Sequence, residues 1–86
     1  MKEVKLNIPE YDGNSLKLIW ENNYKIKVEI DDDSCIIKAN KEGLISLAKQ
    51  LLALAQSLNS NHYHLDEYGA LEDGSNELII CKDDEL

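Results

Sequence analysis

Positive charge is scarce in this sequence. Its 86 residues hold nine Lys and Arg against 17 Asp and Glu, for a formal net charge of −8. Proteins bind nucleic-acid phosphates through clustered basic side chains, so this balance argues against nucleic acid as a direct partner. It suits a basic protein partner, because complementary fields steer association. The alternative is that the acidity only keeps a small protein soluble.

Long apolar runs and targeting signals are also missing. No run approaches the ~20 residues that span a membrane, and no positively charged, apolar N-terminal segment indicates a signal peptide. Cysteine is limited to Cys35 and Cys81, each inside an apolar run. This pattern predicts two small buried side chains, without a disulfide, in a reducing compartment. We therefore expect a cytoplasmic protein with one domain, residues 1–86, and one thin core.

One strong helical pattern is present, between Asn40 and Leu58. Asn40 is a good N-cap residue, and the polar residues after position 56 predict the end of the helix. Apolar side chains recur there at three- and four-residue steps, which is the period of one helix face. The face consists of Leu44, Leu47, Ala48, Leu51, Leu54, Ala55 and Leu58. We expect a sheet to cover this face, with Leu51 buried.

The rest of the chain reads as strands and turns. Alternating apolar residues predict strands at 4–8, 16–20, 24–30, 34–39 and 62–66, and a near-continuous apolar run predicts a sixth, buried on both faces, at 76–82. Turn residues separate them at 10–15, 22–23 and 31–33. Tyr63 and Leu65 should be buried, and Leu71 should anchor the polar loop 67–75. The predicted fold is α+β: a single antiparallel sheet with one amphipathic helix on one face, in the order β-β-β-β-α-β-β.

Residues that could carry chemistry are few. His62, His64 and Asp66 would share one face of a strand, about 7 Å apart along the chain, but no free Cys or His elsewhere completes a metal site. A Cys35–histidine pair would need an accessible thiol, which an apolar strand does not offer. The sequence also lacks a Gly-rich phosphate loop, a Cys-x-x-Cys pair and EF-hand spacing. We predict no catalytic residues, no metal site and no cofactor.

A family resemblance covers about half of the chain, from Asn40 to Lys82. The segment Asn-Lys-Glu-Gly-Leu-Ile-Ser-Leu-Ala-Lys-Gln-Leu-Leu-Ala-Leu, which begins at Asn40, resembles the helix of a family of bacterial immunity proteins from polymorphic toxin systems, immunity protein family 32. The later His-Tyr-His-Leu-Asp-Glu, Leu-Glu-Asp-Gly-Ser and Glu-Leu-Ile-Ile segments are similar to the part of the family's sequence that comes after that helix. The His-x-His-Leu-Asp and Leu-Glu-x-Gly-Ser patterns are the part of the resemblance that is fairly specific to the family. The N-terminal segments resemble the family only in being strand-like.

The resemblance implies a small cytoplasmic protein, encoded with a toxin, that neutralises the toxin by binding and has no catalytic residues to transfer. Such an inhibitor needs a rigid scaffold and a complementary surface. Secreted nuclease toxins are often basic, so an acidic protein can occupy their substrate groove. The candidate partner-binding surface is His62, His64, Asp66, Glu67, Tyr68, Glu72 and Asp73, with Tyr68 as an aromatic anchor. The alternative for each residue is a solvated strand face or loop. The alternative function is a small non-catalytic structural or regulatory subunit that acts through protein–protein contacts.

Overall fold

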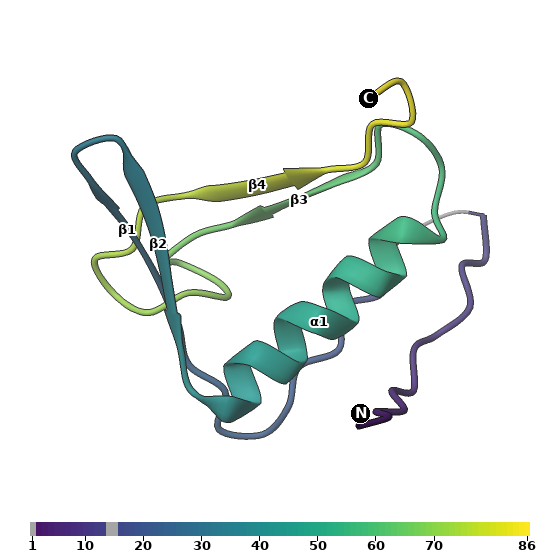
Figure 1. Ribbon diagram of the computed structural model, residues 1–86, viewed down its shortest axis with the longest axis horizontal. Coiled ribbons are helices and arrows are strands. Elements are labelled where there is room, and N and C mark those ends of the chain that lie inside the picture. Colours follow the sequence, from purple (N-terminus) through teal and green to yellow (C-terminus); the bar gives the residue numbers. More distant parts are fainter. Residues whose placement is uncertain (1, 14–15) are drawn as a thin grey trace.

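The computed structural model describes residues 2–13 and 16–86 and has an α+β architecture (Figure 1). Its elements are β1 (Ile26–Asp31), β2 (Ser34–Ala39), α1 (Lys41–Ala55), β3 (His62–Leu65) and β4 (Leu78–Cys81). The α+β class is confirmed, but the observed order is β-β-α-β-β, without the first two strands of the predicted β-β-β-β-α-β-β. The predicted turn at 31–33 joins β1 to β2, and the turn at 22–23 is present with Asn23 at a φ of 63°. The predicted turn at 10–15 includes Asn14 and Ser15, which lie outside the described residues.

The strands form two separate antiparallel pairs, β1–β2 and β3–β4, so the prediction of a single sheet is wrong. The edge of β1 that does not pair with β2 explains why the four strands do not form one sheet. The loop before β4 occupies that edge: the N–H of Glu72 donates to the carbonyl of Ile26 (2.8 Å), and the N–H of Asn76 donates to that of Val28 (2.8 Å). The Val28 N–H donates to the Ser75 hydroxyl (3.1 Å). An irregular loop therefore uses the hydrogen bonds that a third strand would need.

The strands predicted at 4–8 and 16–20 are not formed; no strand occurs in the described part of the chain before Ile26. Figure 1 shows this N-terminal segment beside α1. Polar side chains of α1 take up its backbone groups. Gln50 accepts from the N–H of Ile19 (3.2 Å) and donates to its carbonyl, and the Ser46 hydroxyl accepts from the N–H of Glu21 (2.9 Å). A strand ladder would need those groups. Residues 9–13 and 16–21 are called the strap below.

The N-cap of α1 is confirmed, and it ties the helix to the hairpin. The Asn40 Oδ1 accepts from the N–H of Gly43 (2.8 Å) and from that of Lys25 (2.9 Å). Its Nδ2 donates to the carbonyl of Asn23 (2.9 Å). One amide side chain therefore caps the helix and fixes the chain that enters β1. The helix ends at Ala55, before the predicted Leu58, and the Ser57 hydroxyl donates to the Leu54 carbonyl (2.7 Å).

The core lies between α1, β1, β3 and the loop before β4. Its members are fully or nearly fully buried apolar side chains: Ile26, Val28, Leu47, Leu54, Tyr63, Leu65 and Leu71. The predicted burial of Tyr63, Leu65 and Leu71 is confirmed. Since β3 alternates buried and exposed residues, the β3–β4 pair has one face on the core and one in solvent.

The predicted apolar face of α1 is wrong in most of its members. Leu47 and Leu54 are buried, but Leu51 is 48% exposed, and Leu44 and Leu58 are also exposed. The inward face instead consists of Gly43, Ser46, Leu47, Gln50, Ala53 and Leu54. A face other than the predicted one points inward because Ser46 and Gln50 form hydrogen bonds with the backbone of the strap. Their side chains must therefore face the strap.

Both cysteines and the last strand are also more exposed than predicted. Cys35 and Cys81 are free and exposed, rather than buried. Ile79 on β4 is 52% exposed, so this strand is not buried on both faces. In both sheets the described part of the chain forms only a two-stranded pair, which leaves side chains on the outer surface in solvent.

Candidate functional site

Five of the seven predicted site residues lie on the connection between β3 and β4. Asp66 shapes its first part: its Oδ1 accepts from the N–H of Tyr68 (3.1 Å), and its carbonyl accepts from those of Gly69 (3.3 Å) and Leu71 (2.9 Å). An aspartate that bonds the backbone two residues ahead is a common way of fixing a turn. The turn leaves the ring of Tyr68 90% exposed, on a backbone that is held in place.

Glu67 closes the connection. Its Oε2 accepts from the N–H of Gly74 at 2.7 Å, and Gly74 has a φ of 82°, which glycine adopts without strain. The two ends of the loop are thus joined by one charge-assisted hydrogen bond. The carboxylates of Asp66 and Glu67 therefore stabilise the loop itself, in addition to any contact with a partner.

Glu72 and Asp73 are exposed, and Glu72 has basic neighbours that the predicted acidic and polar surface did not include. Glu72 lines an open hollow of about 260 Å³, together with Lys25, Lys27 and Lys38 of the hairpin. Burial and, second, the charge of Glu72 raise the pKa of the nearby Tyr24 phenol. This end of the loop is therefore mixed in charge.

His62 and His64 lie on the solvent face of β3. Their ring centroids are 4.9 Å apart, and the Nδ1 of His64 is 3.5 Å from the Oε2 of Glu77. Asp66 follows the end of β3 and directs its carboxylate to Tyr68, so the three residues do not converge as ligands. Within residues 2–13 and 16–86, no cluster of three or more His, Cys, Asp or Glu side chains is arranged to hold a metal ion.

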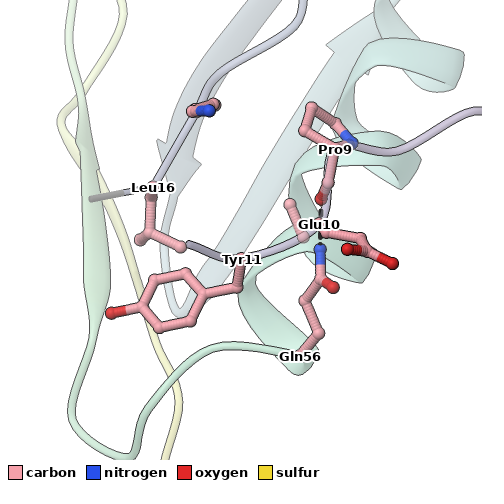
Figure 2. A pocket seen from close by; sticks show the side chains of 7 residues that line it. Pro9, Glu10, Tyr11, Leu16 and Gln56 are labelled. Carbon is pink, nitrogen blue, oxygen red and sulfur yellow. Dashed lines mark hydrogen bonds between the residues drawn. The ribbon is translucent and has the colours of Figure 1, made fainter. Parts of the chain in front are cut away.

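A second hollow lies between the strap and the end of α1 (Figure 2). It holds about 10 Å³, roughly the space of one water molecule. The Nε2 of Gln56 donates to the carbonyl of Pro9 across it, and the hydroxyl of Tyr11 accepts from the Asn61 amide (3.3 Å). The volume is far below the ~300 Å³ of small ligand sites, so this hollow is a feature of packing.

The sequence analysis missed four charged neighbours of the site, Glu77 and three lysines. Glu77, which lies beside His64, precedes β4, and the lysines near Glu72 come from the hairpin. Knowledge of the β3–β4 register would have found Glu77, because Leu65 pairs with Leu78 and thereby places Glu77 near His64. The remaining acidic turn, Asp31–Asp33, lies exposed at the tip of the hairpin. α1, the helix of the described chain, is too short to cross a membrane.

Comparison with known proteins gives one match. The family model described as "Immunity protein 32" matches residues 35–83, which is more than half of the chain and includes all of β2 but its first residue, α1, β3, the loop and β4. No curated protein and no solved structure matches the chain.

Proposed function

The chain belongs to the immunity protein 32 family, and from that membership we propose that it binds a basic toxin in the cytoplasm through loop 66–73. Immunity proteins are non-catalytic inhibitors that neutralise a cognate toxin, so the chain is not an enzyme. The family match carries the general function. The basic nature of the toxin, for example a secreted nuclease, and the place of binding are the proposed part.

The order of the loop supports its use as an interface. Asp66 and Glu67 fix the backbone on both sides of Tyr68, whose ring is 90% exposed. Ordering a loop in advance lowers the entropic cost of binding, and a tyrosine offers a large contact area with few torsions to freeze. Tyr68 is therefore the proposed central anchor, and His62 and His64 are proposed for the rim.

The charge of the chain supports a basic partner. The net charge of −8 attracts a basic surface at long range. Within the loop, the exposed acidic residues are Glu72 and Asp73, which directly follow the buried anchor Leu71. The nearby lysines reduce the local field at Glu72. The contribution of charge should therefore lie mainly in the rate of association.

Co-expression tests the proposal. The gene next to this one is expressed in bacteria with this chain, with an empty vector, or with a Tyr68→Ala variant, and surviving cells are counted. We expect the cells to survive with the wild-type chain but not with the empty vector or the Tyr68→Ala variant. We also expect the two purified proteins to form a stable complex. Equal killing with and without the chain would reject that gene product as the cognate toxin, and full protection by Tyr68→Ala would remove Tyr68 as the anchor.

A further inference from the structure

The helix α1 has a second apolar surface, which points away from the core. Leu44 is 57% exposed, Leu51 is 48% exposed and Leu52 is 49% exposed, while Ile45 and Ala48 are half-buried. Each of the other four residues is three or four positions from Ala48, so the five form one continuous patch on the helix. We call this patch the outer face of α1.

The described part of the chain leaves the three leucines of the outer face largely uncovered. A surface helix of a soluble protein normally has an apolar stripe toward the core and a polar side toward water, whereas a helix that is apolar all round is normally buried. In α1 the inward side even includes Ser46 and Gln50, while three leucines are left in solvent. Exposed apolar patches that are contiguous typically mark a binding surface.

The arrangement of the outer face is self-complementary. Ala48 lies at its centre, with Leu44 and Ile45 four and three residues before it, and Leu51 and Leu52 three and four residues after it. A two-fold axis through Ala48 places Leu44 of one copy against Leu52 of the other, and Ile45 against Leu51. A symmetric dimer interface requires such a patch, and the small central residue allows the two helices to approach closely.

Charge also favours a second copy over a basic partner at this surface. Between residues 43 and 58 the sequence has one charged side chain, Lys49, whose Nζ lies 3.3 Å from the Oε2 of Glu21 in the strap. Two chains of net charge −8 repel each other in most orientations, but contact through the outer face of α1 brings no acidic side chains of this face together. A basic toxin gains no attraction from an uncharged patch.

α1 is long enough for two copies of the helix to lie side by side. Its 15 residues extend over about 22 Å. Helices that cross at about 20° remain in contact along much of their length, which brings Ala55 and the chain around Leu58 to the rim. A specific interface buries about 800 Å² on each partner, roughly one-eighth of the 6356 Å² surface of this chain.

From this pattern we propose that two copies of the chain form a symmetric dimer through the outer face of α1, with the helices crossing at Ala48. The proposal is independent of the toxin and of loop 66–73. It leaves the loop available, because the loop and the outer face belong to different elements.

Sedimentation or light scattering of the full chain over a range of concentrations tests the dimer. The wild-type chain should show twice its monomer mass of 9.8 kDa at high concentration. Leu52→Glu should raise the dissociation constant at least about tenfold, because it places an acidic group in an apolar contact. Ile79→Glu is the matched control: it adds the same charge at an equally exposed apolar residue on β4, and the dimer should persist.

A charge-pair rescue tests the register. Leu44→Lys should weaken the dimer, as Leu52→Glu does. The double variant Leu44→Lys/Leu52→Glu should recover part of the lost association, because each lysine meets the glutamate of the other copy. Positions 44 and 52 are eight residues apart on one helix, so they cannot pair within a chain.

Circular dichroism of each variant establishes that it is folded. A wild-type chain that stays monomeric at all concentrations overturns the proposal, as does a Leu52→Glu variant that dimerises like the wild type. A monomeric wild type whose Leu52→Glu variant fails to bind the toxin would assign the outer face to the toxin instead. A dimer that the double variant does not recover would overturn the crossing at Ala48.

Discussion

The backbone of α1 at Gly43 packs directly against the carbonyl oxygen of Lys25. A Cβ at position 43 would overlap that oxygen and would lie 3.0 Å from the Cγ1 of Ile26 and 3.1 Å from the Cβ of Ala39. The first turn of the helix can therefore lie against the hairpin only because this residue has no side chain. Asn40 binds both backbone groups of Lys25: its Oδ1 accepts from the Lys25 N–H, and its N–H donates to the Lys25 carbonyl. The close contact is therefore with backbone that cannot easily move.

Gly43→Ala should destabilise the protein, although alanine is the better helix former by about 1 kcal/mol. The overlap with the backbone of Lys25 should outweigh that gain, and we expect a net loss of about 1–3 kcal/mol in the free energy of unfolding. Denaturant titration measures it. Gly69→Ala is the control, because a Cβ there meets only the Asp66 Oδ1, at 3.7 Å. Equal stabilities of the two variants would contradict the proposed packing.

Gln50→Met should detach the strap while it nearly preserves the volume of the side chain. It removes both hydrogen bonds to the backbone of Ile19 and leaves those two polar groups beside an apolar side chain. We expect a loss of about 1–3 kcal/mol and faster proteolysis within residues 16–21. Gln56→Met, at an exposed position that bonds only to the Pro9 carbonyl, should cost less. Cleavage in the strap that is no faster in Gln50→Met than in the wild type would speak against this anchor.

Tyr63→Phe should stabilise the protein by about 1 kcal/mol. The hydroxyl of Tyr63 is buried and has no hydrogen-bond partner among the described residues, so its removal relieves a desolvation cost. Thermal or denaturant unfolding at pH 7 measures the change. Tyr68→Phe is the matched control, since that hydroxyl lies on an exposed ring and its loss should change stability by less than about 0.5 kcal/mol. A less stable Tyr63→Phe variant would indicate that the hydroxyl is satisfied.

The advantage of Tyr63→Phe should increase further in alkali. Burial raises the pKa of the Tyr63 phenol above its ordinary value of 10.0, so the unfolded chain loses this proton first. The contribution of this group to stability is present below about pH 10 and is lost as the pH rises through the pKa of the folded state. Phenylalanine has no proton to lose. Unfolding titrations from pH 8 to 11 should therefore show the difference between variant and wild type widening above pH 10; a constant difference would contradict the raised pKa.

Neutralising Glu72 and Asp73 should slow association with a basic toxin and weaken its dependence on salt. Folding should be nearly unaffected, because both side chains are exposed. Asp66 and Glu67 are unsuitable for this test, since their carboxylates hold the loop. The control Asp31→Asn/Asp33→Asn removes the same charge from the hairpin tip. A slower rate in the control alone would move the interface to that tip.

The sequence predicted local features well. The N-cap at Asn40, the limits of the strand at 34–39, the turn at Asn23 and the burial of Tyr63 and Leu65 all depend on neighbours in the chain, and all are confirmed. Residues 16–20 have the alternation of a strand, yet the backbone of Ile19 bonds to the side chain of Gln50, and that of the following Glu21 bonds to Ser46. No pattern within 16–20 reveals that, because the partner is a side chain about 30 residues away.

The orientation of α1 failed for a related reason. Leucine spacing alone predicted burial of Leu51, but the helix is apolar on nearly every side, so spacing could not define one inward face. The hydrogen bonds of the buried Ser46 and Gln50 to the strap determine which face of α1 points inward. For the candidate site, the sequence placed Glu67 and Tyr68 on one loop but put Asp66 at the end of the preceding strand, whereas β3 ends at Leu65. It could not foresee that the carboxylates of Asp66 and Glu67 bond to the loop's own backbone.

Several of the hydrogen bonds that attach the strap to the helix side use the main chain of the strap. Gln56 bonds to the carbonyl of Pro9, Gln50 to the peptide groups of Ile19, and Ser46 to the N–H of Glu21, so these contacts do not depend on which side chains the strap has. Any residue other than proline can donate the N–H at positions 19 and 21. Lys17 and Leu18, which are exposed, can therefore be replaced without loss of the attachment. In this respect α1 is a receptor for a peptide backbone, and the strap offers a surface on which new side chains can be displayed.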